Sequence, residues 1–314
     1  MNDLLLARAS ALGGGFTAAD ALACGYDRQS LSRLVSGGEA VRIARGAYAR
    51  REIFAAASPE QRHRLATRAS VARFAGRVAA SHYSALSLLG LPLWRAALDQ
   101  VHVARIGAGP GRRSSKLHIH SPYTADVYRL ADGLPSVSPG LAVLGTAMLC
   151  GVEAGVVAAD AALAGGLVKD ADLRQSLQQL FRHPSIRDAR LVVDLADMRS
   201  ESPGESRTRL VLQSLALGAV VPQVEIRDDN GRLVARVDFL YEQQRTVVEF
   251  DGLVKYSGAD GREALVAEKR REDRLRDLGF QVVRVTWAEL DRPTLLQHRI
   301  QAAFARTTGA DRSG

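Results

Sequence analysis

The sequence predicts a multidomain protein of the α/β (α+β) class, and three observations support this. The chain has 314 residues, more than a single hydrophobic core usually organises. Its first 57 residues read as short helices followed by a hairpin, and residues 201–306 read as helix, three strands, helix and strand. Residues 58–200 mix strands with alanine-rich helices. We therefore expect domains at 1–57, 58–200 and 201–306, with a disordered tail at 307–314.

Composition narrows the classes of function. The formal net charge is +8, and the basic excess lies mainly in residues 58–200, whereas residues 201–314 are balanced. A basic region of this kind favours a polyanionic partner. Two cysteines, Cys24 and Cys150, exclude a disulfide scaffold and a cysteine zinc site. We find no signal peptide, and the longest nearly apolar run, 141–152, is too short to cross a bilayer, so we expect a cytoplasmic protein without membrane contact.

The first domain shows the pattern of a helix-turn-helix with a wing. A helix at 3–12 is closed by three glycines, and Thr17 with Asp20 forms a capping box for a short second helix. Asp27 caps a third helix at 28–35. Residues 41–48 then alternate as a hairpin that turns at Arg45 and Gly46.

This arrangement is similar to the winged-helix domain that opens AbiEi-family antitoxins, in which the third helix enters the major groove of DNA. The resemblance implies DNA contacts by third-helix residues and by the wing. The candidates for base edges or phosphates are Arg28, Gln29, Ser32 and Arg33, and those for backbone contacts of the wing are Arg42 and Arg45. The alternative is a protein adaptor whose arginines are merely solvated.

The middle domain begins with a basic helix at 59–74 and a second helix that stops at Gly90. Strands at 101–104 and 116–120 flank a glycine-rich loop, and a helical run starts at Ser138. The order resembles the C-terminal region of AbiEi-type proteins. The loop lacks the lysine and hydroxyl residue that end a P-loop, so Arg112, Arg113 and Lys116 are interpreted as phosphate-backbone contacts, or else as a solvated loop.

The histidines of this domain suggest a metal site only weakly. His118 and His120 share a strand face and could coordinate a metal, but no cysteine or acid at ligand spacing accompanies them. Ordinary sheet histidines are the favoured interpretation. His82, which follows Ser81, is interpreted as a residue at a helix start.

The last domain places carboxylates inside apolar strands. Ser202, Pro203 and Glu205 open a helix, and a hairpin turn at 228–231 leads to strands at 233–241 and 246–252. A charged helix at 262–278 and a strand at 281–286 follow. Period-two alternation puts Glu249 and Asp251 on one strand face, close to Asp238. Buried acids are costly without a partner, and a hard cation such as Mg²⁺ is the usual one.

These acids and the order of elements resemble the PD-(D/E)xK nuclease fold, and more narrowly a small domain of unknown function related to very-short-patch-repair endonucleases. The resemblance implies that Asp238, Glu249 and Asp251 hold Mg²⁺ or Mn²⁺ and that Glu205 completes the site. The archetypal motif ends in lysine, where this chain has Asp251; Lys255 and Lys269 are the candidate substitutes. Glu205 also fits a plain capping box, and Lys269 a solvated helix face.

Two functions follow from these patterns. The preferred one is a DNA-binding protein whose last domain is a metal-dependent DNA endonuclease. The alternative is an AbiEi-like transcriptional repressor or antitoxin with a catalytically silent nuclease fold, for which a cognate toxin would be the protein partner. The sequence makes no prediction of an oligomeric state.

Overall fold

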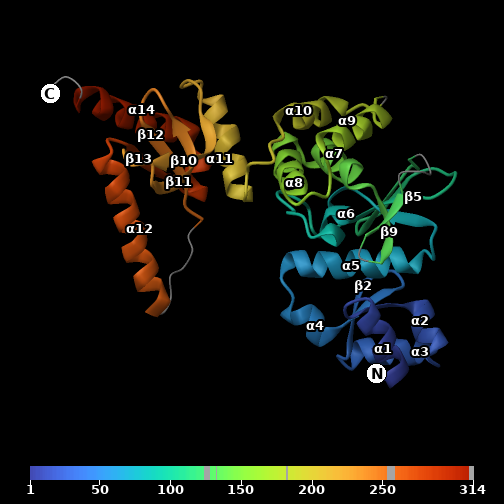
Figure 1. Cartoon of the computed structure of the whole chain (residues 1–314). Coiled ribbons are helices and arrows are strands. Elements are labelled where there is room, and N and C mark those ends of the chain that lie inside the picture. The colour runs from blue at the N-terminus through green and yellow to red at the C-terminus, as the bar shows by residue number, and fades with distance from the viewer. Residues whose placement is uncertain (124–127, 132, 182, 253–258, 311–314) are drawn as a thin grey trace. The chain divides into compact units, whose positions relative to one another are not determined.

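A computed structural model describes residues 1–123, 128–131, 133–181, 183–252 and 259–310. The chain forms two compact units, Met1–Ala196 and Asp197–Gly314 (Figure 1). Several sheets and many helices confirm the predicted mixed α/β class. The boundary expected after residue 57 falls inside the first unit.

The first unit begins with three helices and a three-stranded sheet of order β1-β3-β2. The helices are α1 (Asp3–Ala11), α2 (Ala18–Ala23) and α3 (Arg28–Ser36), and the strands are β1 (Gly15–Thr17), β2 (Ala40–Ala44) and β3 (Ala47–Arg50). Capping boxes form at Thr17 with Asp20 and at Asp27 with Ser30, so the predicted helix starts are correct. Strand β1 was not expected, because it begins at the last of three consecutive glycines. Phe16 at its centre is fully buried.

Helix α5 (Pro59–Arg73) joins the two halves of this unit. Ser58 and Gln61 form its capping box. The helix packs against β1 and β3 on one side and against α6 (His82–Leu89) and β5 (Val101–Arg105) on another. In Figure 1 it lies between the N-terminal helices and the larger sheet. Helix α4 (Arg51–Ala56) precedes it.

The larger sheet has six strands in the order β6-β7-β5-β4-β9-β8. Its other strands are β4 (Val78–Ala80), β6 (Arg112–Arg113), β7 (Leu117–His120), β8 (Tyr128–Ala131) and β9 (Leu134–Val137). Strands β5 and β7 are parallel, with His102 beside His118 and Ala104 beside His120. The helical run that follows comprises α7 (Pro139–Cys150), α8 (Val152–Ala164), α9 (Asp170–Gln179) and α10 (Ile186–Leu195).

The second unit follows the predicted order of helix, three strands, helix and strand. These elements are α11 (Pro203–Ser214), β10 (Val221–Arg227), β11 (Leu233–Tyr241), β12 (Thr246–Phe250), α12 (Ala259–Asp277) and β13 (Gln281–Val285). The four strands are adjacent in chain order, with β12 and β13 parallel. Two further helices, α13 (Trp287–Leu290) and α14 (Pro293–Ala310), end the chain.

Helices cover both faces of this sheet. Phe239 and Val248 pack with Leu296 of α14, whereas Leu240 and Val247 pack with Leu275 of α12. Since neighbouring strand residues point to opposite faces, Asp238 and Glu249 lie on the α12 face.

The structure differs from the sequence expectations at two points here. Strand β12 ends at Phe250, so Asp251 lies beyond the strand in which alternation had placed it. Helix α14 continues to Ala310, so residues 307–310, expected in a disordered tail, are helical. The buried side chains of Leu296, Ile300 and Ala303 anchor this helix on the sheet.

Candidate functional site

Helix α3 presents a polar face to solvent. Leu31 and Leu34 are buried in the N-terminal core, which fixes the orientation of the helix. The opposite side carries the residues predicted from the sequence, all exposed: Arg28, Gln29, Ser32 and Arg33. A short helix anchored by two leucines and free on its polar side is suited to enter a groove.

The wing and the larger sheet share a basic cavity. Arg42 and Arg45 are exposed on the β2–β3 hairpin. Arg45, Arg112 and Lys116 line one cavity of about 440 Å³, whereas Arg42 and Arg113 are exposed outside its lining. Residues far apart in sequence thus form one positively charged hollow within the first unit.

Two further arginines of this cavity were not singled out from the sequence. Arg73 of α5 donates to the backbone carbonyl of Arg45, and burial followed by the charge of Arg45 lowers its pKa. Arg105 at the end of β5 donates to the carbonyl of Pro110 at 2.8 Å, and both arginines line the cavity. Arg73 belongs to the basic helix seen in the sequence, but only the folded sheet shows which of its arginines faces the wing.

In the second unit, the structure brings three of the predicted acids together. In the antiparallel pair of β11 and β12, Phe239 lies opposite Val248. Asp238 is one residue before Phe239 and Glu249 is one residue after Val248, so the two acids lie next to each other. Oδ2 of Asp238 accepts a hydrogen bond from the Phe250 backbone N–H at 2.8 Å. Burial, and then the charges of Glu205 and Glu249, raise the pKa of Asp238 from 3.8 to about 6.

Glu205 is held by three donors. Its carboxylate accepts hydrogen bonds from the Glu201 backbone N–H at 2.9 Å, the Ser202 hydroxyl at 2.8 Å and the Gln223 side-chain amide at 2.8 Å. The Glu205 backbone N–H in turn donates to Ser202 Oγ. The carboxylate therefore does more than close a capping box, because Gln223 reaches it from strand β10.

Glu249 already has a cationic partner. Nη1 of Arg271, on α12, donates to Oε2 of Glu249 at 3.2 Å, and Nη2 of Arg271 donates to Oε1. Arg271 also donates to Glu268 and to the carbonyl of Arg236, each at 3.0 Å. The sequence argument that acids on this strand need a neighbouring cation is satisfied for Glu249 by a side chain of the protein itself.

The other predicted residues lie at the end of β12, on α12 and outside the described residues. Asp251 is half-buried beyond the end of β12, and its backbone N–H donates to the carbonyl of Val285. Lys269 is exposed on α12, and the described residues show no ion pair between it and Asp238 or Glu249. Lys255 lies outside the described residues.

Gln223 and Arg271 were missed as site residues. Gln223 has a φ of 55°, in the left-handed region that side chains rarely adopt, and this conformation accompanies its bond to Glu205. Nothing in the sequence marks that conformation. Arg271 belongs to one of the segments that resemble the PD-(D/E)xK nuclease fold, but its pairing with Glu249 depends on how α12 packs on the sheet.

One comparison with known proteins bears on the first of these regions. Residues 3–51 match the model of a family described as "Transcriptional regulator, AbiEi antitoxin". The matched segment covers α1 to β3, which includes every candidate DNA contact on α3 and the wing. No curated protein matched the chain in a second comparison.

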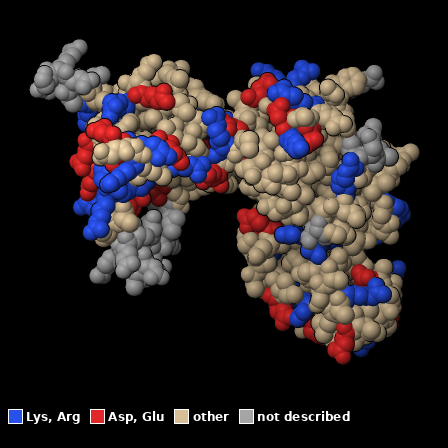
Figure 2. All heavy atoms as spheres, in the orientation of Figure 1, with Lys and Arg blue, Asp and Glu red and all other residues tan. Residues whose placement is uncertain are grey.

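The two units also differ in the charge they present. Figure 2 shows basic and acidic side chains intermixed on the face of the second unit that is in view. The ion pairs of this unit include Arg284 with Glu268 and Glu272. No helix among the described residues is both long and apolar enough to cross a membrane.

Proposed function

We propose that this protein is a DNA-binding transcriptional regulator of the AbiEi antitoxin type. The single observation that carries the proposal is the exposed polar face of α3, within a segment that matches the regulator family model. In this proposal Arg28, Gln29, Ser32 and Arg33 contact base edges or phosphates in the major groove. Arg42 and Arg45 of the wing contact the sugar-phosphate backbone.

The basic cavity extends the proposed DNA contacts. Arg45 lines it together with Arg112 and Lys116 of the larger sheet. Phosphates of DNA that extends past the wing would meet these side chains. Arg113, which lies outside the cavity lining beside His118, is a separate predicted phosphate contact. Such contacts strengthen binding to every sequence and make it dependent on salt.

Arginine substitutions test the division between base and backbone contacts. A site is first selected from random duplex DNA with the full-length protein, and affinities are then measured by gel shift. Arg33→Ala should cost about 1–3 kcal/mol on the selected site and much less on unrelated DNA. Arg112→Ala should weaken binding to both DNAs similarly.

Arg174→Ala is the matched control, because Arg174 is an exposed helix arginine paired with Asp170 away from α3 and the cavity. This variant should bind both DNAs like the wild type. Selection that yields no preferred sequence, or equal affinity of Arg33→Ala and wild type on the selected site, would overturn the proposal.

The antitoxin part of the proposal implies a cognate protein toxin. Its expected genetic sign is a toxin encoded beside this chain, and its expected biochemical sign is relief of that toxin's effect when both are expressed. DNA binding without such relief would leave a regulator that is not an antitoxin.

A second candidate function, a Mg²⁺-dependent nuclease, is favoured by one observation: a half-buried aspartate with a raised pKa beside two other acids. The carboxylate oxygens of Asp238, Glu249 and Glu205 are the donors that a hard cation prefers. In the described structure these three acids do not bring their oxygens within 4.8 Å of one another, so Mg²⁺ or Mn²⁺ would have to draw them together. Asp251 and a lysine, Lys255 or Lys269, would complete the site if loading rearranges them. Bound Mg²⁺ would supply charge neutralisation at a scissile phosphate.

The protein's own residues define what this second function requires. Arg271 must yield one oxygen of Glu249 to a cation, and the three donors on Glu205 hold that carboxylate in place. Glu249→Gln should abolish cleavage of duplex DNA in Mg²⁺ or Mn²⁺, with a loss of at least about 100-fold. The exposed Glu242→Gln is the control. Absence of cleavage by the wild type in both metals would leave the domain a silent fold.

A further inference from the structure

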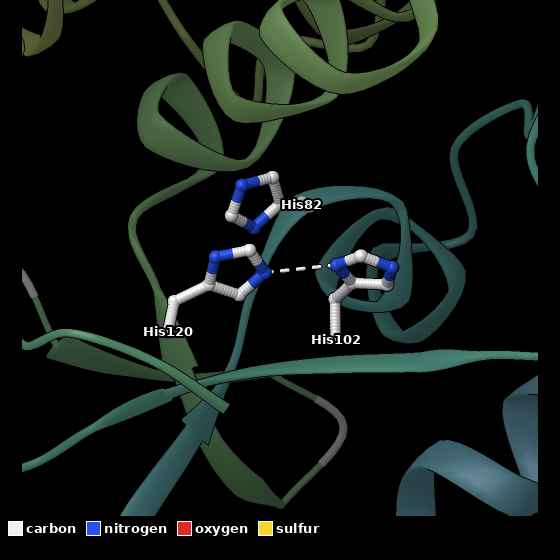
Figure 3. A group of neighbouring side chains, drawn as sticks. All are labelled: His82, His102 and His120. Atoms are coloured by element: carbon white, nitrogen blue, oxygen red, sulfur yellow. Dashed lines mark hydrogen bonds between the residues drawn. The ribbon is translucent and has the colours of Figure 1, made fainter. Parts of the chain in front are cut away.

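Three histidines from separate segments meet in the interior of the first unit. His82 is the first residue of α6, His102 lies on β5, and His120 ends β7. One nitrogen from each ring lies within 4.8 Å of the other two. His102 Nδ1 and His120 Nε2 are 2.8 Å apart, and Figure 3 shows a ring nitrogen of His82 turned toward this pair.

The parallel pairing of β5 and β7 puts these rings side by side. His102 and His120 lie on one face of the sheet, two positions apart in register. Helix α6 packs on β5 and brings His82 over them. The rings of His82 and His120 stack with their centroids 4.0 Å apart.

Ser81 provides a hydrogen-bond partner for one nitrogen of His82, and when that nitrogen donates, the other carries the lone pair. Nδ1 of His82 lies 3.0 Å from Ser81 Oγ, and a hydrogen bond donated there leaves Nε2 as the nitrogen available to the other rings. A partner on the far nitrogen is the usual companion of a metal-binding histidine. His82 has a φ of 52°, so its backbone is strained. A Cβ at Gly145 of α7 would lie 3.1 Å from the His82 ring, so the glycine leaves space for that ring.

Burial favours the neutral form of the three histidines, and among the described residues none of the groups that shift their pKa values is an acid. Burial, and then the neighbouring histidines, lower the pKa of His102 and of His120 to about 3, and that of His82 well below its ordinary value. The charged groups that act on these rings are other histidines and Arg113. Neutral imidazole is the form that coordinates a metal ion.

We propose that His82, His102 and His120 bind a divalent cation of the zinc class, with an open coordination position facing an adjacent cavity. Three imidazoles suit Zn²⁺ and similar first-row ions better than Mg²⁺. The ion takes the place of the hydrogen bond between His102 and His120. Both nitrogens then act as lone-pair donors, so the proton they shared moves to the far nitrogen of its own ring.

The open position follows from the lining of the cavity. A hollow of about 440 Å³ is lined by His82 and His120 together with His118, Tyr123, Gln179 and His183. Since three neutral ligands leave the charge of the ion uncompensated, the fourth ligand is hydroxide or a small anion from this cavity. The site shares no ligand with the proposed DNA contacts or with the acids of the second unit.

Metal titration of the full-length, metal-stripped protein tests the proposal. Zn²⁺ is titrated by calorimetry in excess Mg²⁺, which occupies any site preferred by hard cations. One Zn²⁺ per chain is expected, and His120→Asn should weaken this binding by at least about 100-fold. His298→Asn is the matched control, because His298 is an exposed histidine on α14 of the second unit and is outside the group of three. It should bind Zn²⁺ within about threefold of wild type.

X-ray absorption of the loaded wild type provides a test that needs no variant, and it should show the outer-shell scattering of three imidazole ligands and at least one further ligand that is not imidazole. Uptake of less than one Zn²⁺ at 100 µM free metal, equal affinity of His120→Asn and wild type, or a spectrum with fewer than three imidazoles would each overturn the proposal.

Discussion

Asp238 is an acid in surroundings that disfavour its charge. Its pKa is raised from 3.8 to about 6 by burial and by Glu205 and Glu249, while the Phe250 N–H and Arg271 act in the opposite direction. An acid whose pKa is higher in the folded state favours folding while it is protonated, and this contribution is lost as pH rises through the folded pKa. Between about pH 4 and pH 6 the folded second unit therefore pays an increasing penalty for the carboxylate.

Neutralising Asp238 should remove that penalty. In EDTA, Asp238→Asn should raise the free energy of unfolding by about 1–3 kcal/mol at pH 7.5 and by little at pH 4, because only the ionised form is disfavoured. Urea unfolding is followed by Trp287 fluorescence in a Trp94→Phe background, which isolates the second unit since the chain has two tryptophans. The exposed Asp229→Asn is the control. A gain in stability that does not change with pH would refute the charge argument.

At this scale the sequence predicted the neighbourhood of the acids better than their partners. Alternation was expected to put Glu249 and Asp251 on one strand face, with Asp238 at the same sheet edge, and the structure places Asp238 beside Glu249. Asp251 was expected inside the strand, but β12 ends at Phe250, one residue before it. Arg271 and Gln223 depend on packing between elements. The meeting of His102 with His120 depends on a parallel strand pairing, and that of His82 with both depends on the packing of α6, neither of which spacing in sequence shows.

Helix α11 shows how one residue decides the approach of two elements. A Cβ at Gly204 would lie 1.9 Å from the Phe250 ring of β12, so only glycine permits this contact. Phe250 packs edge-on against Trp287, with centroids 4.7 Å apart, and this leaves the ring little freedom to move. The contact also holds the start of the helix, and with it Glu205, close to the end of β12.

Gly204→Ala should therefore destabilise the second unit by about 1–3 kcal/mol, although alanine is the better helix former. The matched control is Gly252→Ala, whose Cβ would lie at an ordinary 3.5 Å from the same ring. It should change the free energy of unfolding by well under 1 kcal/mol. Equal stabilities of the two variants, measured in urea through Trp287, would contradict the packing argument.

Element starts were predictable where capping chemistry is local. Ser58, Thr17 and Asp27 each mark a helix start by side-chain hydrogen bonds within three residues. The missed strands are two to four residues long, too short for a period-two pattern to appear: β1, β4, β6, β8 and β9. Their pairing is determined by the helices that pack on the sheets.

At the scale of the whole molecule, the two units carry different chemistry. The first unit combines a helix-turn-helix, a basic cavity and a buried histidine cluster, with α5 packed against both the winged sheet and the elements that hold His82 and His102. The second unit gathers acids around a helix-covered sheet. Because the basic excess lies in the first unit, DNA should engage that unit first.

Hydrogen exchange of the full-length protein with and without its selected DNA tests the central claim most directly, since it reports which backbone segments the DNA covers. The account predicts that binding slows exchange in peptides covering residues 27–36 and 40–50, with smaller effects around Arg112 to Lys116. Peptides from α9 and α10 should remain unchanged and serve as the internal control. Protection confined to residues 197–310, with none on α3 or the wing, would contradict the account.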